Sequence, residues 1–173
     1  MASKDEEFSR LFQDFYPSLC RFLECLLGGR ASLAQDLAQE SFLQLHRTAW
    51  SEVPLNEVRF WLYRVARNAA LNESRKGQIR HRLFDRVVEA MRPRTRTPEE
   101  EFELHERRRL VLEMLQGLPE DQRVALLLRE HEQLSYREIA QVLKISESKV
   151  KVDIFRARTA LRARWSKRKK GYS

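Results

Sequence analysis

Basic side chains are concentrated at the C-terminal end of the chain, where they could bind a polyphosphate. Between residues 144 and 173 there are eleven lysines or arginines, against only Glu147 and Asp153. This segment carries a net charge of about +9, whereas the whole chain carries +8. A charge run is usually only a solvated face, but so strong a concentration is typical of proteins that bind nucleic acid.

A second group of residues, in the helix predicted over 57–76, has the chemistry of a single-strand binding site. Phe60, Trp61 and Tyr63 stand among arginines and asparagines. Aromatic rings can stack on unpaired bases while arginine neutralises phosphate. Aromatic residues also dominate protein cores, so Phe60 and Trp61 could equally be core residues. The polar residues considered for this site are Arg64, Arg67, Asn68 and Asn72.

The basic C-terminal segment is predicted to form two short-linked helices. Ser135 and Glu138 form a capping-box pattern that begins the first helix, and Ser146 is a good N-cap for the second, over 147–165. An ordinary helical hairpin with a solvated basic face is the alternative to a helix-turn-helix. The charge concentration favours the helix-turn-helix. The stripe predicted to be buried in the second helix is Val150, Ile154, Ala157, Leu161 and Trp165. This stripe leaves Lys149, Val152, Asp153 and Arg156 facing DNA.

Helical periodicity covers most of the rest of the chain, and no strand-like alternation occurs. The first helix is predicted over 5–27, with Pro17 bending it or starting a second helix and Gly28–Gly29 ending it. Ser32 and Gln35 predict a capping box for a helix over 32–50. A later helix begins at Pro98. Its predicted buried residues are Leu104, Val111, Met114 and Leu115.

Residues 91–101 contain two prolines and alternating charges without a hydrophobic period, which predicts a flexible linker. We therefore predict an all-α fold made of two small helical domains. The first covers residues 1–90 and the second covers residues 102–173, ending in the helix-turn-helix.

The helix over 32–50 is predicted to carry a polar strip opposite its buried side. Such a strip is usually just solvated, but an exposed leucine among carboxylates indicates docking on a partner helix. The strip consists of Asp36, Gln39, Glu40 and Leu43.

Composition and spacing exclude several classes of protein. No apolar run approaches the ~20 residues that span a bilayer, and the N-terminus does not resemble a signal peptide. Cys20 and Cys25 are too far apart on a helix for a disulfide and are expected to be free thiols of a cytoplasmic protein. No metal or cofactor is expected, because the histidines lack ligand spacing. The sequence contains no pattern of a catalytic nucleophile with its general base, so an enzyme is not expected.

Several stretches, taken in order, resemble one known family. They are Ala34-Gln-Asp-Leu-Ala-Gln-Glu-Ser-Phe-Leu43, Phe60-Trp-Leu-Tyr-Arg-Val-Ala-Arg-Asn-Ala69, Leu118-Pro-Glu-Asp-Gln-Arg123 and Leu134-Ser-Tyr-Arg-Glu-Ile-Ala140, followed by Val150 and Ile154-Phe-Arg-Ala-Arg158. Their order and spacing resemble the extracytoplasmic-function (ECF) group of bacterial RNA polymerase sigma factors, from about Asp5 to Arg164.

The resemblance implies a division of labour between the two domains. The first would bind the polymerase clamp and the melted downstream (−10) promoter element, and the second would read the upstream (−35) element as duplex. The strip formed by Asp36, Gln39 and Glu40 matches the clamp-binding stretch, and Asn68 matches a residue that holds a flipped base. The implied partners are core RNA polymerase, promoter DNA and an anti-sigma protein. The residues that match upstream-element contacts are Arg129, Lys151, Val152 and Arg156.

Two positions depart from the family pattern. Lys144 occupies the tight turn of the helix-turn-helix, where a small residue is common. Asp153 places a carboxylate on the recognition helix, where it could accept from a cytosine amino group.

Two rival functions remain. The first is a plain helix-turn-helix repressor. This function would leave the aromatic and arginine residues over 57–76 without a role, and dimeric repressors need a symmetric interface that the sequence does not reveal. A sigma mimic that only sequesters an anti-sigma protein would not need basic residues on both nucleic-acid faces.

Overall fold

The computed structural model of the protein describes residues 4–48, 50, 53–77 and 98–170. Within these residues every regular element is helical, so the predicted all-α class is confirmed. The helices are α1 (Lys4–Leu26), α2 (Ala31–His46), α3 (Leu55–Gly77), α5 (Pro98–Gln116), α6 (Glu120–Glu130), α7 (Tyr136–Leu143) and α8 (Glu147–Lys170).

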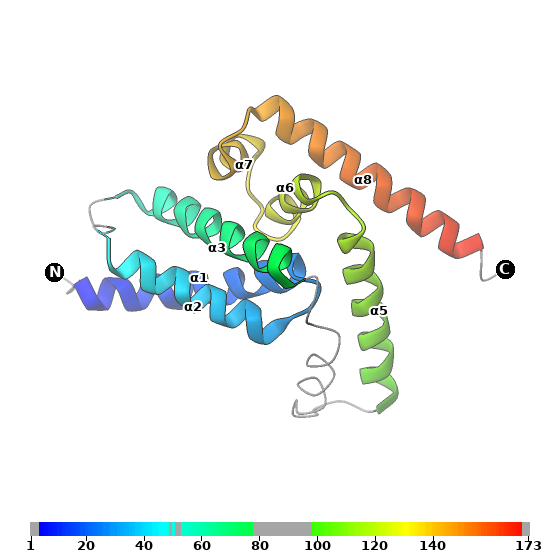
Figure 1. Ribbon diagram of the computed structural model, residues 1–173, viewed down its shortest axis with the longest axis horizontal. Coiled ribbons are helices and arrows are strands. Elements are labelled where there is room, and N and C mark those ends of the chain that lie inside the picture. The colour runs from blue at the N-terminus through cyan, green and yellow to red at the C-terminus, as the bar shows by residue number, and fades with distance from the viewer. Residues whose placement is uncertain (1–3, 49, 51–52, 78–97, 171–173) are drawn as a thin grey trace.

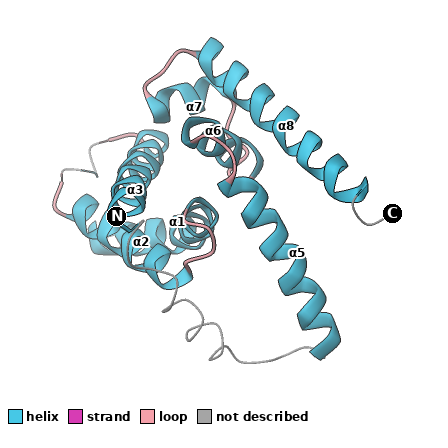
Figure 2. Cartoon of the chain, turned by 45° about the vertical axis from the view of Figure 1, so that its right-hand side comes forward, coloured by secondary structure: helices cyan, strands magenta, loops and turns pink. Residues whose placement is uncertain are grey.

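The first domain consists of α1, α2 and α3, which lie side by side (Figures 1 and 2). Each helix contributes an apolar stripe at helical spacing, represented by Phe22, Phe42 and Leu62, which are almost fully buried. Pro17 lies inside α1 and neither ends it nor starts a new helix. Its side chain is exposed, and the helix continues past it with one backbone hydrogen bond missing, because proline has no N–H group.

The turn between α1 and α2 differs from the prediction. Gly28 and Gly29 both have a positive φ, 72° and 94°, which ends α1 and redirects the chain within two residues. Helix α2 therefore begins at Ala31, with Arg30 as its N-cap and no side-chain capping bond. The predicted capping box at Ser32 is wrong, because that residue already lies in the first turn of the helix.

The second domain consists of α5 to α8, with α7 and α8 forming the helix-turn-helix. The predicted capping box is present: Ser135 Oγ accepts from the Glu138 amide at 3.2 Å, and the Glu138 carboxylate accepts from the Ser135 amide at 2.7 Å. Ser146 Oγ likewise accepts from the Lys149 amide at 3.2 Å. Lys144, in the turn, adopts a left-handed conformation with φ 55°, which costs a non-glycine residue ~1–2 kcal/mol.

The ends of α5 and α8 project from the body of the molecule (Figure 1). Leu104 and Val111 of α5 are 48% and 54% exposed, and Trp165 of α8 is 49% exposed. The prediction that these three residues are buried is therefore wrong. Their periodicity is helical, but Val111 and Trp165 face away from the contacts that these turns make, through Arg108 with Glu24 of α1 and through Arg164 with Met114. Leu115 is buried as predicted, because α5 meets the rest of the domain at its C-terminal end.

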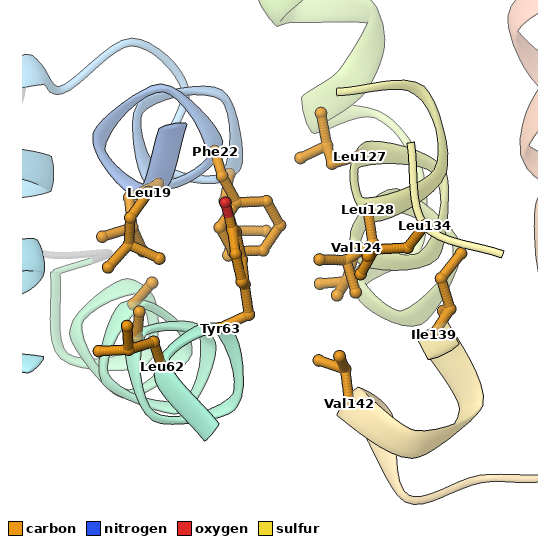
Figure 3. Close-up of a cluster of buried hydrophobic side chains, with 14 of the residues drawn as sticks. Leu19, Phe22, Leu62, Tyr63, Val124, Leu127, Leu128, Leu134, Ile139 and Val142 are labelled. Carbon is orange, nitrogen blue, oxygen red and sulfur yellow. The ribbon is translucent and has the colours of Figure 1, made fainter. Parts of the chain in front are cut away.

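The second domain packs on α1 and α3 of the first, and buried residues of both belong to one apolar cluster. Figure 3 shows Leu19, Phe22, Leu62 and Tyr63 from the first domain opposite residues of α6, α7 and the segment between them. Most of the predicted linker lies outside the described residues, and its last four residues belong to α5, which begins at Pro98 as predicted.

Candidate nucleic-acid interface

The polar residues predicted for the single-strand site lie along one side of α3. Asn68 and Asn72 are exposed, whereas Arg64 and Arg67 are half-buried. Arg67 Nη1 donates to Asn68 Oδ1 at 3.2 Å, which orients the amide beside a cationic group. Trp61 is half-buried at the N-terminal end of the same helix. The structure thus brings these five residues onto one helix face.

Two of the three aromatic residues considered for this site belong to the core. Phe60 is 6% exposed and Tyr63 is 1% exposed. The Tyr63 ring packs edge-on against Phe22 with centroids 5.3 Å apart, and its hydroxyl donates to Glu132 of the second domain. Burial, followed by the charge of Glu132, raises the pKa of the Tyr63 phenol far above its usual range. Only Trp61 remains available for stacking on a base.

A cavity of about 460 Å³ adjoins Trp61. This volume falls within the range of small-molecule pockets, ~300–1,000 Å³. Trp50, in the wall of the cavity, is 6% exposed, and its Nε1 donor has no hydrogen-bond partner among the described residues. The wall of the cavity thus mixes polar and apolar side chains, and the Trp50 Nε1 atom itself is buried. Its other lining residues include Leu45, Phe60, Arg64 and Gln141.

The polar strip on α2 has the geometry that the sequence predicts. Asp36, Gln39 and Glu40 are exposed and Leu43 is 48% exposed, while Phe42 and others on the opposite side are buried. A partner could therefore contact the whole strip without disturbing the core.

The N-terminal half of α8 presents an exposed face of mixed chemistry. Val150, Ile154 and Ala157 are buried as predicted, which turns Lys151, Val152 and Arg156 outward. Phe155, which the sequence reasoning did not select, is 70% exposed between Val152 and Thr159 on this face. Phe155 lies off the buried stripe in the sequence pattern, and this position alone could have predicted that its ring is exposed.

Asp153 does not face solvent, so the prediction that it points toward DNA is wrong. It is 5% exposed, because a helix turns ~100° per residue and this position lies next to Ile154 and Ala157 at the edge of the buried stripe. Its carboxylate accepts from Lys149 Nζ at 2.6 Å, and Lys149 also lies 3.2 Å from Asp121. The hydrogen bond to Asp153 is the main cause of a raised Lys149 pKa. Asp153 thus holds a cation instead of meeting a base.

Arg129 is engaged within its own domain. Its Nη1 donates to the Leu134 carbonyl at 2.8 Å, and its guanidinium lies 5.2 Å from the Tyr136 ring centroid. Lys151 also approaches this ring, at 6.0 Å. Arg129 therefore fixes the segment that leads into α7, close to the exposed face of α8.

Comparison with known proteins assigns the family. Residues 11–80 match the family model Sigma-70 region 2, and residues 108–161 match the model Sigma-70, region 4. The RNA polymerase sigma-H factor of Pseudomonas aeruginosa is 36% identical over 140 residues, which cover 76% of this chain and 72% of that protein. The ECF RNA polymerase sigma factor SigM of Bacillus subtilis is 29% identical over 166 residues, covering 94% of this chain and 95% of SigM. The chain belongs to the ECF group of sigma factors.

As a sigma factor it recognises promoters and initiates transcription with RNA polymerase. Two solved sigma factors share its fold. CnrH, in complex with the cytosolic domain of CnrY, aligns with a TM-score of 0.70 at 21% identity, covering 95% of this chain and 90% of that one. RpoE, in complex with the anti-sigma factor NepR from Bartonella quintana, aligns with a TM-score of 0.62 at 20% identity, covering 91% and 95%. No helix in the described part of this sigma factor is long and apolar enough to cross a membrane.

Proposed function

We propose that the two domains read the two promoter elements through different chemistry. The exposed face of α3 binds the melted −10 element, and the N-terminal half of α8 reads the −35 element as duplex. The observation that carries the first assignment is the cavity beside Trp61, which Arg64 of the same helix also lines. The residues proposed to contact the melted strand are Trp61, Arg64, Arg67, Asn68 and Asn72.

The cavity suits an unstacked base because it can repay the cost of unstacking. Extruding a base from duplex DNA costs a few kcal/mol. Stacking on an aromatic ring returns ~1–3 kcal/mol per base, and Trp61 supplies such a ring. Asn68 lies about two turns farther along α3 than Trp61, where it can bond a neighbouring group of the strand.

On α8 the apolar and basic side chains have complementary uses. Arginine can bond a guanine edge with two donors, worth ~1–3 kcal/mol of discrimination, and this role is proposed for Arg156. Val152 and Phe155 can contact thymine methyl groups. Lys149 and Lys151 supply phosphate contacts, which position the helix without reading sequence. Asp153 aligns Lys149, and Arg129 fixes the approach to α7.

The strip on α2 is proposed to dock on a basic helical part of core polymerase. Asp36 and Glu40 would steer the approach, and Leu43 would pack against the partner. The factor itself carries out no covalent step, since the polymerase forms the bonds, and it acts in the cytoplasm with that enzyme. The complex of RpoE with the anti-sigma factor NepR supports an anti-sigma partner for this factor as well.

Run-off transcription with purified core polymerase tests this function. Templates should be drawn from the native genome, and polymerase without the factor is the control. We expect defined transcripts only when both are present. Polymerase that binds the factor but starts at no promoter would contradict the assignment and favour a sequestering mimic.

A further inference from the structure

The C-terminal half of α8 combines a dense positive charge with an exposed aromatic ring. Residues 156–170 contain eight lysines or arginines and no acidic residue. Trp165 is 49% exposed among them. In Figures 1 and 2 this half of the helix runs away from α7 and from the half proposed to read the −35 element. The promoter contacts assigned above therefore give this ring and its basic neighbours no role.

Contacts with α5 hold the end of α8 in a fixed orientation. Arg164 Nη1 donates to the Met114 carbonyl at 2.8 Å, and Arg164 Nη2 donates to the Gly117 carbonyl. One turn later, Arg168 Nη1 lies 3.8 Å from the Glu113 carboxylate. Because Trp165 follows Arg164 and is rotated by ~100° from it, these contacts turn part of its ring to solvent. A ring that is already held in place loses little conformational freedom when it binds a ligand.

Two arginines flank Trp165 on its own side of the helix. Arg162 lies three positions before it and Arg168 three positions after it, a spacing that places Cβ atoms ~5–6 Å apart. Arg162 is exposed, and the side chain of Arg168 is 41% exposed. An aromatic ring between two cations suits single-stranded nucleic acid, because a base can stack on the ring while the guanidinium groups neutralise the adjoining phosphates.

The position of Trp165 favours an unpaired strand over the −35 duplex. Trp165 lies ten residues beyond Phe155, which is ~15 Å farther along α8 and ~80° around it. The major groove is ~12 Å wide, so a duplex that receives Phe155 in its groove does not also bring base edges to Trp165. Within a duplex, moreover, each base is covered on both faces by its stacked neighbours. The Trp165 ring can therefore stack only on a base that is unpaired.

We propose that Trp165, Arg162 and Arg168 form a second single-strand site, which binds an unpaired segment of nucleic acid while the N-terminal half of α8 holds the −35 duplex. The site uses none of the residues assigned to the melted strand on α3. Base stacking and phosphate neutralisation are common to RNA and single-stranded DNA. An unpaired transcript and a displaced DNA strand are thus the two sources of such a ligand.

Photo-crosslinking of the full chain locates the bound strand and distinguishes the two sources. The probes are 12-nucleotide oligouridylate and oligodeoxythymidylate, each with one 5-iodouracil base, which crosslinks to an aromatic ring stacked on it. Peptide mapping should find a crosslink at Trp165, and the probe that gives the higher yield identifies RNA or DNA as the preferred strand. A crosslink at Trp61 alone would place all strand binding on α3 and would overturn the proposal.

Anisotropy with fluorescein-labelled forms of the same strands measures the contribution of the ring. All variants carry Trp61→Ala as well, so that binding on α3 does not mask the result. Stacking of one base is worth roughly 5- to 150-fold in affinity. Because only half of the ring is exposed, we expect Trp165→Ala to weaken binding about tenfold, whereas Trp165→Phe should retain most of the affinity. Equal losses on a 12-base-pair duplex would show that the ring does not stack on bases and would overturn the proposal.

A pair of double variants tests the two arginines. Arg162→Gln with Arg168→Gln should flatten the salt slope for the single strand by about 1.4, since each phosphate contact contributes about 0.7. Arg107→Gln with Arg109→Gln is the charge-matched control, because these exposed arginines, like Arg168, pair with glutamates of α5. Equal flattening in both double variants would mean a general charge effect and would contradict the site.

A protein contact is the alternative use of an exposed tryptophan. If neither strand crosslinks to Trp165, and Trp165→Ala instead weakens binding to core polymerase in a pull-down titration, the ring belongs to a protein interface and the proposal is wrong. A crosslink at Trp165 together with the tenfold loss supports it.

Discussion

Replacing Phe155 with alanine should weaken −35 binding while leaving the fold intact. The ring is 70% exposed, so its loss should change the free energy of unfolding by less than ~0.5 kcal/mol. An aromatic side chain offers ~200 Å² of surface, of which about 140 Å² is exposed here. If the major groove covers half of that, about 70 Å² leaves water, which is worth ~1.8 kcal/mol or roughly 20-fold in affinity.

The assay is anisotropy with a duplex selected from a random library by the wild-type protein, and with a scrambled duplex, each at several salt concentrations. Affinity for the selected duplex should fall roughly 20-fold while the salt slope stays constant, because no charge is removed. Trp165→Ala is the control: this residue is 49% exposed on the same helix but ~15 Å farther along it. Equal losses on both duplexes, or no loss, would refute a base-reading role for Phe155.

Three other outcomes are expected. Reversing Asp36 and Glu40 to lysine should lower affinity for core polymerase in a pull-down titration without changing the melting temperature, because both side chains are exposed; unchanged affinity would remove the strip from the docking site. Asn68→Ala should weaken anisotropy-detected binding to single strands more than binding to duplex, and equal losses would indicate a purely electrostatic face. The Ser135 amide and then its hydroxyl lower the Glu138 pKa, so this carboxylate stabilises the fold above its unfolded pKa of ~4.3, and that stability is lost as pH falls through the lowered folded pKa. Urea titrations should show a flatter dependence on pH below 5 for Glu138→Gln, and Ser135→Ala should cost ~1 kcal/mol at pH 7; an unaltered pH profile would exclude the capping box as its source.

The elements that the sequence predicted correctly depend on local signals. The capping box at Ser135 and Glu138, the N-cap at Ser146 and the stripe of Val150 and Ile154 each depend on residues within one or two helical turns. Ser32 shows the limit of this reasoning. Gln35 stands three residues after it, as a capping box requires. The turn at Gly28 and Gly29, however, lets α2 begin at Ala31, one residue before Ser32.

Exposure at the edges of a stripe could not be predicted, because it depends on which neighbour covers each turn. Asp153 lies at such an edge and is buried, whereas Trp165 continues the stripe and is exposed, although its neighbour Arg164 contacts the end of α5. The contact between Tyr63 and Glu132 joins residues 69 positions apart. No spacing rule connects such positions, so the covering of α3 by the second domain emerges only from the tertiary structure.

Arg164, near the end of α8, has a consequence for the order in which the protein folds during synthesis. Its guanidinium donates to the carbonyls of Met114, at 2.8 Å, and Gly117, which are left without helical partners at the end of α5. The second domain is therefore completed only after Arg164 has left the ribosome. The first domain ends about ninety residues earlier in the chain and can fold as soon as α3 emerges. On every nascent chain, then, the basic face of α3 is exposed to the cell for several seconds before the helices that cover it exist.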